Sequence, residues 1–205
     1  MDLIAQGEHQ KQDFKFEIND ARKIARTIVA FSNTEGGKLL IGVKDNGRIA
    51  GVHSEEEYYM IESAASLYCK PEIRFTVNKW QVKDKAVLEV DIPKGTEKPY
   101  LAKTEDNRWL SWVRVNDQNF LANSIQLRVW KNEKRKKGVF IKFTGHEKML
   151  LEYLQDKPIT LTQFTKISGL SRKKASDILV RLITLGLVEI GYSEKEITYK
   201  ASGIN

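Results

Sequence analysis

The chain has 205 residues, of which 41% are hydrophobic, and its formal net charge is +7. This apolar fraction is enough to form a core, so a largely disordered chain is not expected. No apolar run reaches the ~18–20 residues of a membrane span, and the first ten residues lack the basic and apolar regions of a signal peptide. With one cysteine and three histidines, neither an internal disulfide nor a Cys/His zinc site is expected. These features indicate a globular protein of the cytoplasm.

The positive charge is confined to one end of the chain. Residues 1–130 contain 19 Lys and Arg against 19 Asp and Glu, whereas residues 131–205 contain 15 against 8. Such asymmetry favours a polyanionic partner for the basic part, with nucleic acid ahead of a membrane surface, although a merely solubilising surface is an alternative. The basic run that starts at Lys131 predicts a linker over 131–143, between one domain at 1–130 and another at 144–205.

The first domain begins with a helical pattern and continues with a strand-like one. Asn19 or Asp20 is placed to cap a helix over 21–32, whose apolar residues recur at helical spacing. A glycine-containing break follows, and a short, mostly apolar strand is expected over 38–43.

Turn and capping signals organise the rest of this domain. The Asp-Asn-Gly sequence at 45–47 predicts a hairpin turn into a returning strand over 48–52. Ser54 and Glu57 form a capping box, which predicts a second helix as far as about residue 68. Further strands are expected over 73–77, 86–92 and 109–115. The elements indicate an α+β domain with mostly antiparallel pairing.

The second domain changes to helices that each open with a capping signal. These signals are Thr144 with Glu147, Thr160 with Gln163, and Ser171. Gly186 ends the third helix, and two alternating strands are expected over 187–192 and 196–200. Two helices, a glycine-containing turn, a third helix and a hairpin follow the order of a winged helix-turn-helix domain.

In a helix-turn-helix, the first turn of the recognition helix faces the major groove of DNA. The candidate contacts in this turn are Ser171, Arg172, Lys173 and Lys174, and the secondary candidates are Thr162, Lys166 and Arg181. Two alternatives stay open: a solvated helix face, and a domain for protein interaction or dimerisation. The tip of the hairpin carries Glu194 and Glu196 around Lys195, which argues against a grip on the minor groove.

Several motifs of the first domain resemble the Schlafen/AlbA-like domain family, long labelled "divergent AAA". The matching segments are Glu8, Asp13-Phe14-Lys15, the run from Ala30 to Gly37, the run from Leu40 to Val52, Lys98-Pro99-Tyr100 and Trp112–Val115. They cover roughly residues 6–122. Asp13 stands where the family usually has Glu, and Asn116 replaces a usual Gly. The resemblance implies a mixed-sheet domain with a role in DNA binding.

The resemblance also implies a second function. Some Schlafen relatives are metal-dependent ribonucleases, and their acidic trio corresponds to Glu8, Asp13 and Asp45. Such carboxylates hold Mg²⁺ or Mn²⁺ against a scissile phosphate. The structural alternative is a turn residue at Asp45 and a surface carboxylate at Glu8. No other cofactor is expected, because the sequence after Gly36 is not a phosphate-binding loop of the ATPase type.

The leading interpretation is a bacterial transcriptional regulator that contacts double-stranded DNA through the winged helix. A metal-dependent nuclease and a non-enzymatic interaction module are the alternatives. We expect no membrane partner. A homodimer would suit palindromic operators, but the sequence contains no decisive interface for it.

Overall fold

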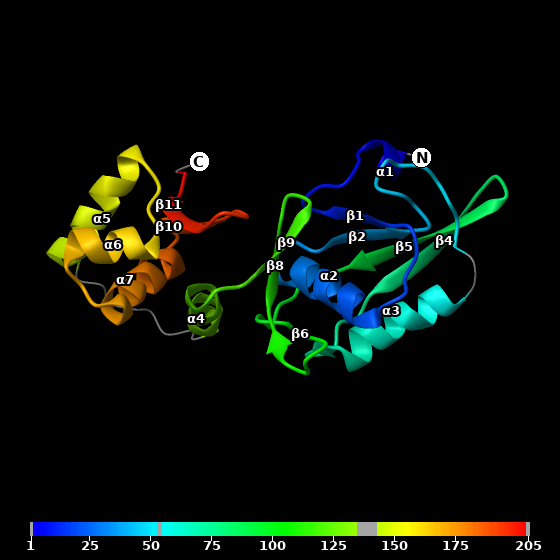
Figure 1. The fold of residues 1–205 in the computed structure, drawn as a ribbon, viewed down its shortest axis with the longest axis horizontal. Coiled ribbons are helices and arrows are strands. Elements are labelled where there is room, and N and C mark those ends of the chain that lie inside the picture. The colour runs from blue at the N-terminus through cyan, green and yellow to red at the C-terminus, as the bar shows by residue number, and fades with distance from the viewer. Residues whose placement is uncertain (1, 53–54, 135–142, 204–205) are drawn as a thin grey trace. The chain divides into compact units, whose positions relative to one another are not determined.

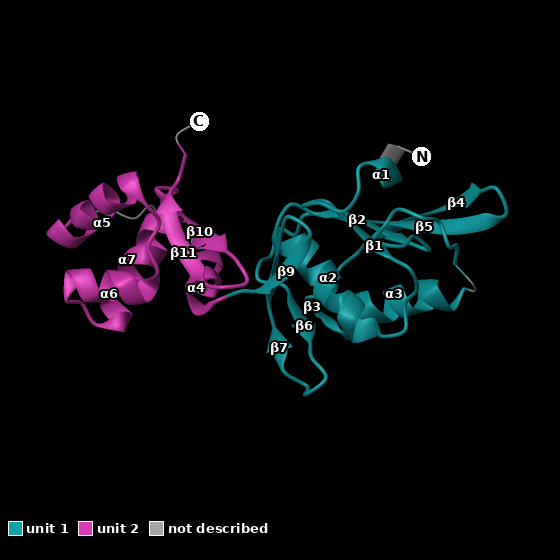
Figure 2. Ribbon diagram, turned by 45° about the horizontal axis from the view of Figure 1, so that its top comes forward, with its two compact units in different colours: residues 1–122 teal, residues 123–205 magenta. Residues whose placement is uncertain are grey.

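The computed structural model describes residues 2–52, 55–134 and 143–203. The chain forms two compact units, residues 1–122 and 123–205 (Figure 2). The second unit thus begins before residue 130, the predicted end of the first domain, because helix α4 (Ser124–Glu133) packs its buried residues into the core of that unit. The predicted linker 131–143 overlaps the end of α4, and its residues 135–142 lie outside the described residues.

A mixed four-stranded sheet organises the first unit. Its strands stand in the order β1-β2-β5-β4, where β1 and β2 are parallel and the other neighbours are antiparallel. The bounds are β1 (Gln12–Lys15), β2 (Gly37–Ile41), β4 (Thr76–Val82) and β5 (Lys85–Ile92). The unit is therefore α+β with mostly antiparallel pairing, as predicted.

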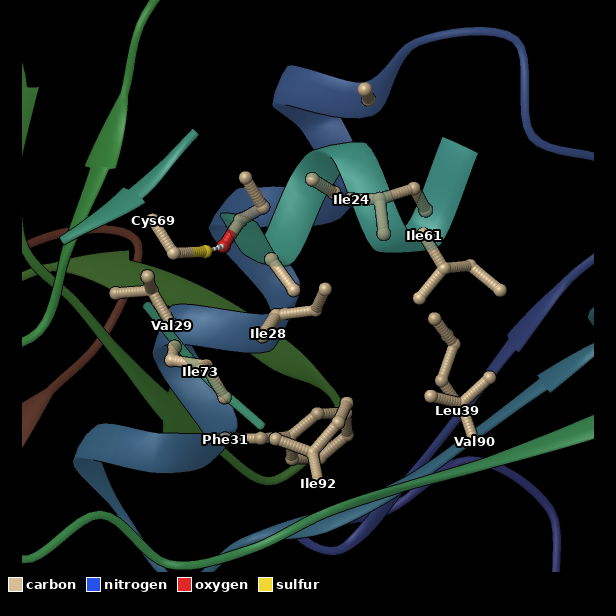
Figure 3. Packing of buried hydrophobic residues seen from close by; sticks show 14 of the residues in the cluster. Ile24, Ile28, Val29, Phe31, Leu39, Ile61, Cys69, Ile73, Val90 and Ile92 are labelled. Carbon is tan, nitrogen blue, oxygen red and sulfur yellow. Dashed lines mark hydrogen bonds between the residues drawn. The ribbon is translucent and has the colours of Figure 1, made fainter. Parts of the chain in front are cut away.

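Helices α2 (Ala21–Asn33) and α3 (Glu56–Leu67) cover one face of this sheet (Figure 1). Because side chains alternate along a strand, Leu39 of β2 and Val90 of β5 point toward the helices. There they join Ile28 and Phe31 of α2 in the main core (Figure 3). The opposite face carries a smaller cluster around Phe14, against which α1 (Asp2–Ala5) packs.

Two small sheets complete the first unit on the α2 side. One contains β3 (Cys69–Lys70), β6 (Leu101–Lys103) and β7 (Trp109–Leu110), and the other contains β8 (Trp112–Val115) and β9 (Gln118–Leu121). Both sheets lie against α2, which is consequently buried along most of its length.

Several predicted strands differ from the observed ones. Residues 48–52 form no strand; only an isolated bridge joins Val43 to Ile49, because the chain turns away at Gly42 and Gly51, both with positive φ. The predicted strand over 109–115 is divided at Ser111 into β7 and β8, and the one over 73–77 begins later, at Thr76. Residue 54 of the predicted capping box lies outside the described residues, and α3 begins at Glu56.

The described residues of the second unit form four helices and a hairpin. Besides α4, they are α5 (Gly145–Asp156), α6 (Leu161–Ser168), α7 (Arg172–Thr184), β10 (Val188–Tyr192) and β11 (Ile197–Ala201). The two predicted capping boxes, at Thr144 and Thr160, are both present. Strands β10 and β11 pair antiparallel.

The core of this unit draws on every one of its elements. Leu150 of α5, Phe164 of α6, Leu179 of α7 and Tyr199 of β11 are fully buried together. The backbone of Tyr199 also exchanges two hydrogen bonds with Ile159, at 2.8 and 2.9 Å, which ties the hairpin to the segment before α6. Within the described residues of both units, no helix is long and apolar enough to cross a membrane.

Candidate nucleic-acid interface

The junction between α6 and α7 exposes a cluster of positive charge. Gly169 ends α6 in the left-handed conformation, with φ of 67°. Ser171 then caps α7, and its Oγ accepts a hydrogen bond from the N–H of Lys174 at 3.4 Å. The tight connection places Arg172, Lys173 and Lys174 in the first turn of α7. All three are exposed, and none forms an ion pair with another described residue.

These cations stand where the helix itself disfavours them. The first turn of a helix carries partial positive charge from its free N–H groups, so it favours acidic side chains and anions. Helix α3 follows this rule with Glu56 and Glu57, and α5 follows it with Glu147, but the first turn of α7 contains no acidic residue. An anion bound at this turn would relieve the repulsion between the cations and the helix end.

The secondary candidates divide into two kinds. Thr162 and Lys166 are exposed on α6, the helix that leads into the same junction. Arg181, by contrast, forms an ion pair with the buried carboxylate of Glu147, at 2.7 Å. Arg181 therefore joins α7 to α5, and its guanidinium is already occupied.

Glu147 is the centre of that contact. Its burial alone would raise the pKa of the carboxyl, but hydrogen bonds from Thr144 and the charge of Arg181 outweigh burial and hold the pKa below its usual range. The carboxylate is thus ionised at neutral pH, and it fixes both the start of α5 and the position of α7.

The hairpin tip is closed by its own hydrogen bonds. The backbone N–H and the Oγ of Ser193 both donate to the carbonyl of Glu196, at 3.2 and 2.8 Å. Two glutamates and one lysine occupy residues 194–196. The tip is net acidic, so the candidate interface remains on the helices rather than on the hairpin.

Two of the three predicted nuclease carboxylates lie together. Glu8 accepts a hydrogen bond from the N–H of Phe14 at 2.8 Å, and its side chain is hydrogen-bonded to Asp13. Burial, and then the bond to Asp13, raise the pKa of Glu8 above its usual value. Asp45 lies in the exposed turn that was predicted for it.

The carboxylate of Asp13 is engaged by two cations. Its Oδ1 accepts from Arg114 at 3.2 Å and its Oδ2 from Lys15 at 2.8 Å. Arg114 is fully buried beneath β1, where it also donates to the carbonyl of Gln12 at 3.1 Å and stacks over the ring of Phe31. The sequence places Arg114 in a family motif, but no local pattern identifies it as the partner of Asp13.

The three carboxylates do not come together as one group. Across residues 2–52, 55–134 and 143–203, no three His, Cys, Asp or Glu side chains come together in a group able to hold a metal ion. The contact of Asp13 with Arg114 joins β1 to β8.

The segment 33–37 is also explained by packing. The side-chain amide of Asn33 donates to the carbonyls of Tyr100 and Trp112, both at 2.9 Å, and its oxygen accepts from the N–H of Tyr100. A Cβ on Gly36, whose φ is 75°, would lie 2.7 Å from the backbone N of Lys94, and one on Gly37 would lie 2.5 Å from the ring of Phe31. These glycines permit close packing, which accounts for their presence in this turn.

Comparison with known proteins identifies the first unit. The family model described as Schlafen, AlbA_2 matches residues 8–123, more than half of the chain. The chain therefore belongs to the Schlafen AlbA_2 family. A search of curated proteins finds no match.

Two solved structures are similar in part. One is the DIP2311 protein from Corynebacterium diphtheriae, with 17% identity and a TM-score of 0.45; the match covers 80% of this chain but 31% of that protein. The other is the N-terminal domain of an ATP-dependent DNA helicase RecG-related protein from Nitrosomonas europaea. It has 25% identity and a TM-score of 0.40, and the match covers 51% of this chain and 80% of that domain.

Proposed function

We propose that the protein binds double-stranded DNA through its second unit, which we interpret as a winged helix-turn-helix domain with α7 as the recognition helix. The observation that carries this proposal is the row of unpaired, exposed cations at Arg172, Lys173 and Lys174 in a first turn without acidic residues. Such a turn contacts base edges and phosphates together when it enters the major groove. Lys166 and Thr162 of α6 are the flanking contacts.

The charge of the unit supports this proposal. Residues 123–205 carry 16 Lys and Arg against 8 Asp and Glu, whereas residues 1–122 carry 18 against 19. The excess lies in the unit that contains α7, where it attracts phosphates over the screening distance of the solvent. Control of transcription in a bacterial cytoplasm is the physiological function that we propose for such binding, and a dimer would read a palindromic site.

The test is a titration of a fluorescein-labelled duplex with the full chain, followed by anisotropy at several salt concentrations. Each phosphate that a cation neutralises contributes about −0.9 to the slope of log K against log salt. The variant Lys173→Glu/Lys174→Glu should lower affinity about 100-fold near physiological salt and reduce the magnitude of that slope by about 2.

A matched control variant changes two exposed lysines of the same unit, one on α5 and one just after it. Lys148→Glu/Lys157→Glu removes the same number of positive charges from exposed positions of the same unit. We expect this variant to lose less than about 5-fold, because only general attraction is reduced. Equal losses for the two variants, or a wild-type protein without salt-dependent binding, would contradict the proposal.

A further inference from the structure

A second basic surface lies in the first unit, which has no excess of positive charge. A groove of about 400 Å³ runs between the start of α2 and the strands β6–β8. Its cationic lining residues are Arg22, Lys23, Arg26, Lys103 and Arg108, and its acidic ones are Glu105 and Asp106. The groove is therefore a local concentration of positive charge on a unit that is nearly neutral as a whole.

Most of these cations have no anionic partner. Arg108 is paired with Asp106. The other four cations form no ion pair with any residue in the described parts of the chain. Lys23 and Arg26 are exposed, while Arg22 and Lys103 are half-buried in the wall. Four unpaired cations around one groove repel one another, and a polyanion would neutralise that repulsion.

The start of α2 repeats the feature found in α7. Asp20 caps the helix by accepting from the N–H of Arg22, at 2.9 Å, but the first turn contains no acidic residue. Arg22, Lys23 and Arg26 instead occupy the first two turns, close to the partial positive charge of the helix end. The arrangement lowers the stability of the helix, and it raises the affinity of this end for an anion.

An aromatic residue of the lining, Trp112, adds a second kind of contact. The guanidinium of Arg26 lies over the ring of Trp112, 5.2 Å from the ring centre. Arg22 lies at the same distance over Tyr68, a residue outside the groove lining. The indole Nε1 of Trp112 and the Nε of Arg22 are buried donors without an acceptor among the residues that the structure describes. Planar guanidinium and indole groups are the surfaces on which unpaired bases stack.

We propose that this groove binds single-stranded nucleic acid, with phosphates at Lys23 and Lys103 and a base stacked on the Arg26–Trp112 pair. An acidic peptide would satisfy the charges but would leave the planar pair unused. A duplex keeps its bases stacked inside and offers no free base face. A mononucleotide has both a base and a phosphate, but the cations are spread over two walls of the groove, which suits several phosphates in a row. The site is independent of α7 and of the proposed duplex contact.

The experiment measures binding of a labelled oligothymidylate of about eight nucleotides, within the usual site size, to the full chain. An abasic strand of the same length serves as the second probe. Lys23→Glu/Lys103→Glu should lower affinity for oligothymidylate at least 10-fold. Lys79→Glu/Lys83→Glu, the same change at exposed positions of the β4–β5 hairpin, should leave it within about 2-fold.

Arg26→Ala tests the stacking contact, because Arg26 is exposed and its replacement leaves the core intact. Wild-type protein should prefer oligothymidylate over the abasic strand about 10-fold, and Arg26→Ala should remove most of that preference. Thermal unfolding of each variant confirms that the first unit is folded.

Three outcomes would overturn the proposal. The first is equal binding of oligothymidylate by the groove variant and its control. The second is displacement of the strand by polyglutamate of equal charge, and the third is displacement by thymidine monophosphate at an equal concentration of nucleotide. Repeating the titration in the Lys173→Glu/Lys174→Glu variant separates the two sites. Retained single-strand binding there supports the groove, even if duplex binding by the wild-type protein is absent.

Discussion

The two units each contain one helix that begins with unpaired cations and one arginine that pairs with a buried carboxylate. The helix starts are similar: α2 and α7 both have a side-chain cap and no acidic residue in the first turn. The arginines differ. Arg114 is 1% exposed and its partner Asp13 is 5% exposed, whereas Arg181 is 39% exposed beside the buried Glu147.

This difference separates cations that hold the fold from cations that are free to bind. A fully buried guanidinium needs its partner, since an unpaired charge in the interior is very costly. A cation that is exposed at a helix start does not need such a partner and is available to a ligand. The two helix starts also differ in their surroundings. The start of α2 lines a groove that contains Trp112, whereas the start of α7 follows a tight turn between helices.

The largest expected effect comes from breaking the more deeply buried ion pair. Arg114→Met should lower the free energy of unfolding of the first unit by about 3–5 kcal/mol, because Asp13 loses a buried partner. Arg181→Met should cost the second unit only about 1 kcal/mol, since water screens that pair and Thr144 still donates to Glu147. Hydrogen exchange in urea, detected by mass spectrometry, measures the free energy of unfolding of each unit separately. Equal costs would contradict the distinction between them.

A smaller effect is expected from Asn33, which joins the end of α2 to the strands of the groove. Asn33→Ala should destabilise the first unit by about 2–3 kcal/mol, because the N–H of Tyr100 and two carbonyls lose their partner. Ser32→Ala, which removes a single bond to the carbonyl of Pro93, is the control at about 1 kcal/mol. Because Asn33 holds Trp112, oligothymidylate affinity should fall while duplex affinity is unchanged.

The smallest effect concerns the carboxyl of Glu8 and depends on pH. Its pKa is raised in the folded protein, so the folded state binds more protons than the unfolded state as pH rises through the usual range for Glu, and stability falls there. Glu8→Gln keeps an acceptor for the N–H of Phe14 and removes this loss. The variant should gain on the wild type between about pH 4 and 7, by a few tenths of a kcal/mol after screening.

Urea unfolding at about pH 4 and at about pH 7 measures the difference in stability between Glu8→Gln and the wild type. The same gain at both values would show that Glu8 does not titrate against Asp13. A loss of stability at pH 7 would show that the negative charge of Glu8 stabilises the folded protein there, which would contradict this prediction.

The sequence predicted most helices well, because their signals are local. Caps at Asp20 and Ser171, the capping boxes at Thr144 and Thr160, and periodic apolar residues set α2, α5, α6 and α7 close to their observed bounds. Strands were predicted less well. β1 was missed, because its partner β2 lies more than twenty residues away and the pairing depends on the tertiary fold.

The sequence alone determined the division of charge, the family and the position of the cations in the first turn of α7, since each can be recognised in neighbouring residues. Only the tertiary structure decided what the other charges do. It paired Asp13 with Arg114 and Glu147 with Arg181, and it placed Lys103 beside the unpaired cations of α2. These contacts join residues dozens of positions apart, where no local pattern records them. Burial decided which charges require a partner, and that is a property of the packed core.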